Sequence, residues 1–566
     1  MKAGDVSLVP SPRKAEWSGW WVREGACAER IVPGLGREEY RIGVGEGGVV
    51  LEAGGAAGAF YARGTLEQIR RQSPAGMLPE GRVEDGPAFG VRGYYLDVSR
   101  GRVPRLDRLK RKVEVLAGLK VNRLYLYMEH VFRFAADPRI AGNEDAFGAG
   151  EIRELDAFCR ERHVELVPSF SCFGHMGKIL SLPGYRELAE AEFPAPDWES
   201  ASWLQRLRGA TIDAAMPESR ALLERLLGEL LPCFSSGWFH LCGDETHDLG
   251  KKRGVSGAEA LGELYARHVR WVAGVAARHG KRVQLWGDVL RKLPGAVAAL
   301  PEGAEVLDWA YFPSNAIDGG RFFAEKGVRV AGCLSVRGFG AVFPAVEEAR
   351  EVIGRWAREA EACGAAGIVN TDWGDYGHFL MPGCAWHGIA AGAEASWGGG
   401  RAVAGMGRGG AFDGAFSRAF FGEGGEGVAE WFSRLGSLPP VLLSWPMAAA
   451  GGKPAGCVVA PPMPDAAACA EAAEEAEECA RGFGSLPAGG AGWADGTDLA
   501  ELALAARFAA FAARWGAGAV PEALARELDA LDQAYGELWL AGSRPLGLPD
   551  LRARGFEALR RLLRRE

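Results

Sequence analysis

Long apolar runs are absent from this chain of 566 residues, although 48% of those residues are hydrophobic. A transmembrane helix needs about 18 or more consecutive apolar residues, so the sequence predicts no membrane span. The opening residues MKAGDVSLVPSPRKAEW also lack the apolar stretch of about 7–15 residues that marks a signal peptide. The expectation from these absences is a cytoplasmic protein.

A cysteine framework and an excess of basic residues are missing as well. The 11 cysteines are odd in number, scattered and without a C-x-x-C pair, which argues against a zinc knuckle and for a reducing compartment. The formal net charge is -8, so no basic patch for nucleic acid is expected. Neither a glycine-rich phosphate turn nor a group of histidines dominates the sequence, so we expect no cofactor and no metal ion.

What the chain does contain is three regions of different composition. Residues 1–88 alternate short apolar strands with turns around one helical segment, 58–72, which predicts a small α+β domain. Residues 406–566 are rich in Ala, Leu and Arg and poor in strand patterns. They predict an α-helical domain, with helices at 465–481, 497–515, 521–541 and 549–565.

The middle region, residues 89–405, repeats strand and helix patterns. Apolar strand patterns lie at 93–98, 123–128, 164–170, 238–242, 282–286, 305–309, 329–334 and 367–371. Helical patterns separate most of them, as at 106–119. Eight strands alternating with helices predict an α/β fold of the (β/α)8 barrel type. A doubly wound open sheet is the alternative, which is weakened because no G-x-G-x-x-G follows the first strand.

In such a barrel the working residues lie at the C-terminal ends of the strands. Those positions hold carboxylates, histidines and aromatic rings, namely Asp97, Glu129, His130, His175, His240, Asp244, Glu245, Trp286, Asp288, Trp309, Tyr311, Trp373, Asp375 and His378. Carboxylates transfer protons and bind hydroxyls, and tryptophan faces stack on the apolar faces of sugar rings. The combination predicts a carbohydrate site.

The adjacent acids Asp244 and Glu245 are the sharpest feature of that set. They follow the apolar run WFHLCG at a predicted strand end, where neighbouring side chains alternate in direction. One acid can therefore face the reacting bond while the other faces a different substrate group. Two close carboxylates also shift each other's pKa, so that one can act as an acid near neutral pH. A solvated or salt-bridged acidic pair is the alternative interpretation.

Residues 240–245, HLCGDE, resemble the H-x-G-G-D-E signature of family 20 glycoside hydrolases, the β-N-acetylhexosaminidases, with Cys242 in place of a glycine. The likeness continues in the family's order over residues 8–17, 58–69, 89–104, 119–128, 211–230 and 371–378. It spans about residues 8–400 of the chain. The resemblance implies a TIM barrel preceded by an α+β domain.

The resemblance also implies roles for single residues. Asp244 matches the aspartate that orients the substrate's acetamido group, and Glu245 matches the general acid/base. Arg92 matches the arginine that binds ring hydroxyls, and Asp375 matches an acid that binds the outer hydroxyls. The remaining matches are pocket tryptophans and a pocket histidine, namely Trp286, Trp309, Trp373 and His175.

The sequence departs from the family pattern in three places. Residues 171–175 read SCFGH, where the family often has D-x-P-G-H. Residues 125–130 read YLYMEH where HLHLTD is usual, so Glu129 stands in for an aspartate. No tyrosine matches the one after strand seven, and Tyr311 is the candidate for its contact with the acetamido oxygen. The departures resemble the hexosaminidase D-like branch, whose members tend to be intracellular.

The implied function is exo-acting hydrolysis of terminal non-reducing β-linked GlcNAc, GalNAc or both, with retention and with the substrate's acetamido group as nucleophile. The expected partner is a glycan or glycoconjugate that ends in N-acetylhexosamine. A sugar-binding barrel with altered catalysis and a transglycosylase of the same fold are the alternatives. The sequence leaves open the choice between the two sugars, the natural aglycone, the role of the C-terminal helices and homo-oligomer formation.

Overall fold

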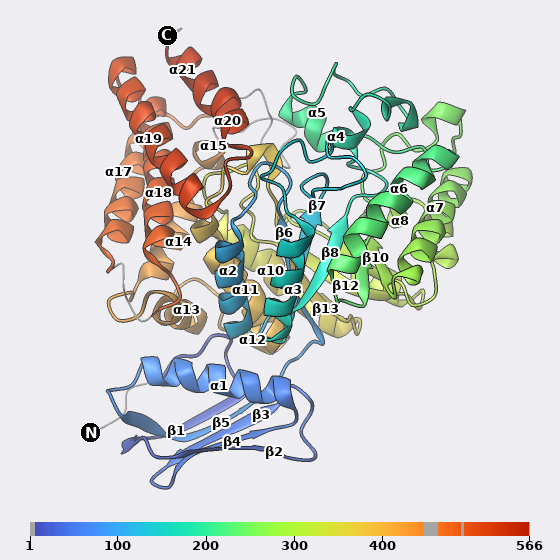
Figure 1. Ribbon diagram of the computed structural model, residues 1–566. Coiled ribbons are helices and arrows are strands. Elements are labelled where there is room, and N and C mark those ends of the chain that lie inside the picture. The colour runs from blue at the N-terminus through green and yellow to red at the C-terminus, as the bar shows by residue number, and fades with distance from the viewer. Residues whose placement is uncertain (1–5, 445–461, 488–491, 565–566) are drawn as a thin grey trace.

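The computed structural model describes residues 6–444, 462–487 and 492–564, which form a barrel flanked by an N-terminal sheet domain and a C-terminal group of helices (Figure 1). Residues 1–5 and 565–566 of the predicted end domains lie outside the described residues, as does Cys457. Across the described part, every helix is too short or too polar to cross a membrane. The domain boundaries after residues 88 and 405 stay predictions.

The N-terminal domain is a five-stranded sheet with one long helix packed on its face (Figure 1). The helix is α1 (Ala56–Arg71), and the strands pair in the order β1-β5-β3-β4-β2. Buried and half-buried residues alternate along β3, because only one face of the sheet is covered. The strands are β1 (Lys14–Arg23), β2 (Cys27–Ile31), β3 (Tyr40–Gly45), β4 (Gly48–Ala53) and β5 (Met77–Asp85).

The centre of the molecule is a closed barrel of eight parallel strands, which confirms the predicted (β/α)8 fold. The strands are β6 (Val91–Asp97), β7 (Arg123–Met128), β8 (Glu165–Phe170), β9 (Trp238–His240), β10 (Arg282–Trp286), β11 (Glu305–Trp309), β12 (Arg329–Ser335) and β13 (Gly367–Asp372). Every residue of β6 and of β13 is buried, because helices cover the outside and side chains fill the inside.

Helices follow most of the strands and cover the barrel. They are α2 (Leu106–Gly118), α3 (Ala149–Arg160), α6 (Pro217–Leu230), α7 (Ala258–Arg278), α8 (Asp288–Lys292), α9 (Gly319–Ala324), α10 (Val346–Ala362), α11 (Trp386–Gly398) and α12 (Gly400–Val403). The connection after β8 is longer than the others and carries two short helices, α4 (Gly177–Leu180) and α5 (Trp203–Arg208), beyond the ends of the strands (Figure 1).

The C-terminal part is helical, as predicted, and lies against one side of the barrel (Figure 1). Arg111 on α2 pairs with Asp498 at 2.7 Å, and Asp498 also accepts a hydrogen bond from the indole of Trp386 at 3.0 Å. These buried contacts fix the group on the barrel. Its helices are α13 (Ala411–Phe421), α14 (Val428–Gly436), α15 (Pro440–Leu443), α17 (Ala466–Ser485), α18 (Gly496–Gly516), α19 (Pro521–Gly542), α20 (Leu548–Leu551) and α21 (Glu557–Leu563).

The N-terminal domain is joined to the barrel through a buried carboxylate at the end of β5. Asp85 accepts hydrogen bonds from Tyr40 Oη at 2.6 Å and Trp397 Nε1 at 2.9 Å, and Lys120 Nζ lies 2.9 Å away. Tyr40 belongs to the sheet domain, whereas Lys120 and Trp397 belong to the barrel. The domain therefore sits under the N-terminal ends of the strands and leaves their C-terminal ends free for a site.

Candidate active site

The chain turns sharply over the barrel mouth directly after β9. Cys242, Gly243 and Glu245 have φ values of 63°, 82° and 43°, all in the left-handed region. For Cys242 and Glu245 this conformation is strained, and such strain is concentrated at functional sites. Tyr265 Oη supports the turn by donating to Gly243 O at 2.9 Å. The turn presents Asp244 and Glu245 side by side at the mouth, as the sequence predicts.

His175 bridges these two acids. Its Nε2 lies 3.4 Å from Asp244 Oδ2 and 3.3 Å from Glu245 Oε2. Burial disfavours the charged imidazolium, but the Asp244 charge and the hydrogen bonds to both acids outweigh burial and raise the pKa of His175 to about 10. Burial also disfavours the Glu245 carboxylate, yet the contact with His175 lowers the pKa of Glu245 to about 2. The proton of this pair therefore lies on His175.

One oxygen of Asp244 is left without a partner. Asp244 Oδ1 is buried, and no described residue donates a hydrogen bond to it. A buried acceptor without a donor costs about 1–3 kcal/mol, so this oxygen is suited to receive a hydrogen bond from a ligand.

Asp288, at the start of α8, is a third carboxylate beside this pair. Its Oδ2 accepts a hydrogen bond from the Glu245 amide at 3.2 Å, which helps to hold the strained turn. Burial and the nearby Asp244 charge raise the pKa of Asp288 to about 7.

Arg100 connects the opposite side of the mouth. Its guanidinium donates to Glu129 Oε1 at 3.1 Å and to Asp375 Oδ1 at 2.9 Å, and lies over the ring of Trp373 at 5.2 Å. The arginine follows β6 in a loop held by Asp97, whose Oδ1 accepts from the Arg100 amide at 3.1 Å. Burial raises the pKa of Asp375 to about 6 although Arg100 opposes the shift. The site residues predicted from the sequence did not include Arg100.

Arg92, which the sequence predicted as the hydroxyl-binding arginine, is not in this site, and that prediction is wrong. It lies at the opposite, N-terminal end of β6 and is fully buried. Its guanidinium binds Glu38, the carbonyl oxygen of Lys120 at 2.8 Å and that of Phe89 at 2.8 Å. The motif RGYYLDVSR holds two arginines, and the length of β6 places the second at the mouth. The signal that could have identified Arg100 is its place in the loop after a barrel strand, where the working residues of such barrels lie.

The aromatic residues divide into two layers. Trp373 and Tyr311 are 8% exposed at the mouth, and Trp373 Nε1 donates to Tyr311 Oη at 3.0 Å. Trp309 stacks on Tyr311 at 5.2 Å between ring centroids. Trp286, predicted to line the pocket, is fully buried and packs beneath Trp373 at 5.8 Å. Trp286 therefore supports the mouth from below rather than lining it.

Thus the structure brings together Arg100, Glu129, His175, Asp244, Glu245, Trp373 and Asp375 around one opening. In the described residues, no group of three or more His, Cys, Asp and Glu side chains is arranged to hold a metal ion. The arrangement offers an acid, a second carboxylate with a free acceptor, and an arginine with acids and an indole for ring hydroxyls and a ring face.

Comparison with known proteins gives a family. Residues 89–333 match the model for the catalytic domain of glycosyl hydrolase family 20, and residues 5–86 match the model for domain 2 of that family. A beta-hexosaminidase of Akkermansia muciniphila is 28% identical over 42% of this chain and 52% of its own length. Human hexosaminidase D is 24% identical over 52% of this chain and 62% of its own. The chain thus spans about half the length of the curated relatives it matches.

Solved structures agree on the fold. An exo-beta-N-acetylglucosaminidase from Vibrio harveyi, in complex with N-acetylglucosamine, has a TM-score of 0.55 and 18% identity over 70% of this chain and 74% of its own. A beta-N-acetylhexosaminidase has a TM-score of 0.57 and 20% identity over 70% of this chain and 91% of its own. With both family models matched in order along one chain, this protein belongs to glycosyl hydrolase family 20.

Proposed function

We propose that the protein is an exo-acting β-N-acetylhexosaminidase that removes terminal β-linked GlcNAc, GalNAc or both by a substrate-assisted, retaining mechanism. The named relatives support hexosaminidase activity in general. The observation that carries the finer proposal is Asp244 Oδ1, which is buried beside Glu245 and has no hydrogen-bond partner among the described residues. This oxygen can accept a hydrogen bond from the N–H of a 2-acetamido group, whose carbonyl oxygen then attacks the anomeric carbon.

The remaining residues take complementary parts in this mechanism. Glu245 donates a proton to the departing glycosidic oxygen and afterwards takes one from the attacking water. Because the proton lies on His175 in the free protein, it passes to Glu245 along their 3.3 Å contact when substrate binds. Asp244 offsets the positive charge of the oxazolinium intermediate. Arg100 and Asp375 bind the outer hydroxyls, and Trp373 supports the sugar ring.

A comparison of four aryl β-glycosides tests the substrate class: those of GlcNAc, GalNAc, glucose and galactose. We expect turnover of the first two and almost none of the others, because glucose and galactose lack the acetamido nucleophile. Products are followed by NMR, and a sugar acceptor is added in a parallel reaction to detect transglycosylation. Comparable turnover of the glucoside, or an inverted product, would contradict the proposal.

Two variants separate the roles of the acids. Glu245→Gln should lose about 10²–10⁴-fold in kcat on poor leaving groups and much less on activated aryl glycosides, since proton donation matters most for a basic leaving group. Asp244→Asn should slow both substrates, because it acts on the nucleophile. Asp318→Asn, a surface carboxylate that is 63% exposed, is the matched control. Equal losses for both variants on every leaving group would contradict the role assignment.

A further inference from the structure

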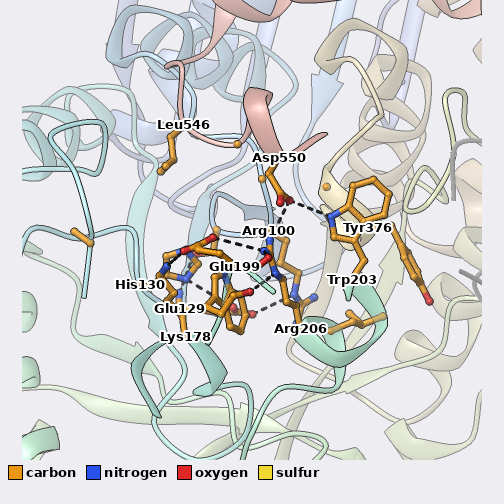
Figure 2. A pocket seen from close by; sticks show the side chains of 17 residues that line it. Arg100, Glu129, His130, Lys178, Glu199, Trp203, Arg206, Tyr376, Leu546 and Asp550 are labelled. Atoms are coloured by element: carbon orange, nitrogen blue, oxygen red, sulfur yellow. Dashed lines mark hydrogen bonds and ion pairs between the residues drawn. The ribbon is translucent and has the colours of Figure 1, made fainter. Parts of the chain in front are cut away.

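The segment that follows β6 lines two of the cavities in the described part of the chain. The cavity that Arg100 and Glu129 line is part of the candidate active site (Figure 2). The other has a volume of about 40 Å³ and lies where the barrel meets the C-terminal helices. Lys112 on α2, Asp372 at the end of β13 and Glu501 on α18 line this second cavity, which we call the interdomain cavity.

Four buried polar atoms belong to residues that line the interdomain cavity and have no hydrogen-bond partner among the described residues. They are Arg102 Nε, Lys112 Nζ, Asp372 Oδ1 and His378 Nδ1. Each of the four side chains is more than nine-tenths buried. Three of the atoms are nitrogens, and those of Arg102 and Lys112 can only donate. The cavity is therefore suited to a ligand that mainly accepts hydrogen bonds.

Arg102 and Lys112 are cations without a carboxylate partner in the described part of the chain. Arg102 donates to uncharged groups, Ser543 Oγ at 3.3 Å and Tyr535 Oη at 3.2 Å. Lys112 Nζ lies 4.5 Å from the ring centroid of Trp386. Burial lowers the pKa of Lys112, and a bound anion would favour the charged form of the amine. Since an uncompensated buried charge is unfavourable, these two cations favour an anion beside them.

The other two arginines that line the cavity are already neutralised. Arg108 pairs with Asp495 at 2.7 Å, and Arg111 pairs with Asp498 at 2.7 Å. These two ion pairs balance each other in charge, so they neither supply nor consume a counter-ion for the cavity.

The remaining acids of the lining do not balance Arg102 and Lys112. Burial and the nearby Asp498 charge raise the pKa of Glu501 to about 7, so Glu501 is mostly uncharged at pH 6. Asp372 accepts a hydrogen bond from Tyr94 Oη at 2.5 Å through its other oxygen and supplies at most one negative charge. At pH 6 two cations thus face one carboxylate, and one monovalent anion restores the balance.

The size of the cavity limits which anion fits. A buried water molecule needs about 10–15 Å³ of such space, so about 40 Å³ holds two or three particles of that size. A halide ion with one water molecule fits these limits. A tetrahedral oxyanion such as sulfate, with five heavy atoms, is too large.

We propose that the interdomain cavity binds a small monovalent anion such as chloride, with Lys112 Nζ and Arg102 Nε as its donors. Burial and the charges of Arg102 and Lys112 hold the pKa of His378 well below its ordinary value, so its neutral imidazole can donate from Nδ1. A water molecule beside the ion donates to Asp372 Oδ1. The site is independent of the proposed function, because its ligand takes no part in the reaction.

The anion would stabilise the contact between the barrel and the C-terminal helices. Lys112 comes from α2, whereas Arg102 binds Ser543 and Tyr535 of the C-terminal part. An ion held by both cations therefore lies between the two parts of the molecule and binds only when they are docked.

Thermal unfolding at pH 6 in sodium chloride, bromide or gluconate at equal ionic strength tests the site. A ligand that binds only the folded state raises the Tm with its concentration. We expect a saturable rise of about 2 °C or more in chloride relative to gluconate, which is too large for the cavity. Bromide should act like chloride, and its anomalous signal in crystals should lie within hydrogen-bonding reach of Lys112 Nζ. Equal Tm values in chloride and gluconate would mean that water alone fills the cavity, and would overturn the proposal.

Variants assign the effect to the cavity. Lys112→Met keeps the length of the side chain without its charge and should abolish the difference in Tm between chloride and gluconate. Asp372→Asn removes the opposing charge and should lower the chloride concentration at half-saturation several-fold. Lys110→Met is the matched control, because Lys110 lies on the same helix but pairs with Glu154 at the surface, and it should keep the wild-type response.

Two outcomes of these variants would contradict the site. One is a chloride response that survives in Lys112→Met, and the other is a response that Lys110→Met also loses. If Lys112→Met does not fold, the half-saturation of Asp372→Asn and the bromide position in the wild type decide, and an unchanged half-saturation with bromide elsewhere would overturn the proposal.

Discussion

At the scale of single residues, two arginines of one motif show how position decides role. Arg92 lies at the N-terminal end of β6, where its guanidinium forms an ion pair with Glu38 of the sheet domain. Arg100 follows the C-terminal end of the same strand and binds two acids of the site. Both guanidinium groups bind carboxylates, but only the Arg100 side chain, 13% exposed, can meet a ligand.

Matched lysine variants should separate these roles. Arg100→Lys keeps the positive charge beside Glu129 and Asp375 but loses the planar fork, so we expect kcat/KM to fall roughly 100-fold with the fold retained. Arg92→Lys should lower the free energy of unfolding by about 2–3 kcal/mol and leave kcat/KM per folded molecule unchanged. Steady-state kinetics and denaturant unfolding of both variants check this, and the reverse pattern would restore Arg92 to the site.

Asp288 gives the stability of the protein a pH dependence. Its pKa is about 7 in the folded state, above the ordinary value of 3.8, chiefly because it is buried. A raised pKa means that the folded state binds the proton more tightly than the unfolded state. The stabilisation from this proton is complete below pH 4 and is lost as the pH rises through 7.

Asp288→Asn should remove that loss. At each pH the quantity of interest is the free energy of unfolding of the variant minus that of the wild type. From the size of the pKa shift, this difference should be about 2–4 kcal/mol larger at pH 8 than at pH 4. Denaturant titrations at both pH values measure the difference, with Asp318→Asn as the exposed control. A pH-independent difference would mean that folding does not shift the pKa of Asp288.

At the scale of elements, the loop after β6 is held by glycines from three segments. A Cβ atom on Gly101 would lie 2.6 Å from the carbonyl oxygen of Gly377, and one on Gly547 would lie 1.9 Å from the carbonyl oxygen of Gly101. The backbone that leads into α20 thus touches the loop that carries Arg100. We therefore expect the position of Arg100 to depend on this contact.

Two glycines with the same backbone conformation test that dependence. Gly547 and Gly518 have φ values of 86° and 84°, so alanine should cost about 1–2 kcal/mol of strain at either position. A Cβ on Gly518 would meet nothing within 4 Å. We expect Gly547→Ala to reduce kcat/KM at least tenfold, whereas Gly518→Ala should lose only stability. Similar activity in the two variants would show that α20 does not position the loop.

The strands and the C-terminal helices could be predicted from the sequence because their signals are local. Apolar runs of the right length predicted the barrel strands, and the helix predicted at 497–515 is α18 (Gly496–Gly516). Asp244 and Glu245 could be located because they lie in the short turn that follows a strand. The contact between α5 and α20 could not be predicted, because Arg206 and Asp550 are 344 residues apart in the sequence and their contact leaves no local pattern. The depth of Trp286 likewise depends on packing inside the closed barrel.

At the scale of the whole molecule, the C-terminal helices contact the barrel segment that follows Arg100 and so support one side of the candidate site. The buried Arg102, next to the Arg100 loop, lies 3.9 Å over the ring of Trp539 and donates to Tyr535 Oη at 3.2 Å. Arg544 then donates its amide to Val103 O at 2.8 Å. The C-terminal helices are thus part of the support of the site, a role that composition did not indicate.

These contacts also set an order of events during translation. Tyr535 is 433 residues beyond Arg102, so at about 5–20 residues per second the ribosome delivers it roughly 20–90 seconds later. All eight barrel strands have left the ribosome well before that time, while the segment that follows Arg100 still lacks its contacts with the C-terminal helices. A nascent chain therefore completes the barrel before the contacts around the Arg100 loop are complete, and we expect the candidate site to reach its final geometry only when the last helices dock.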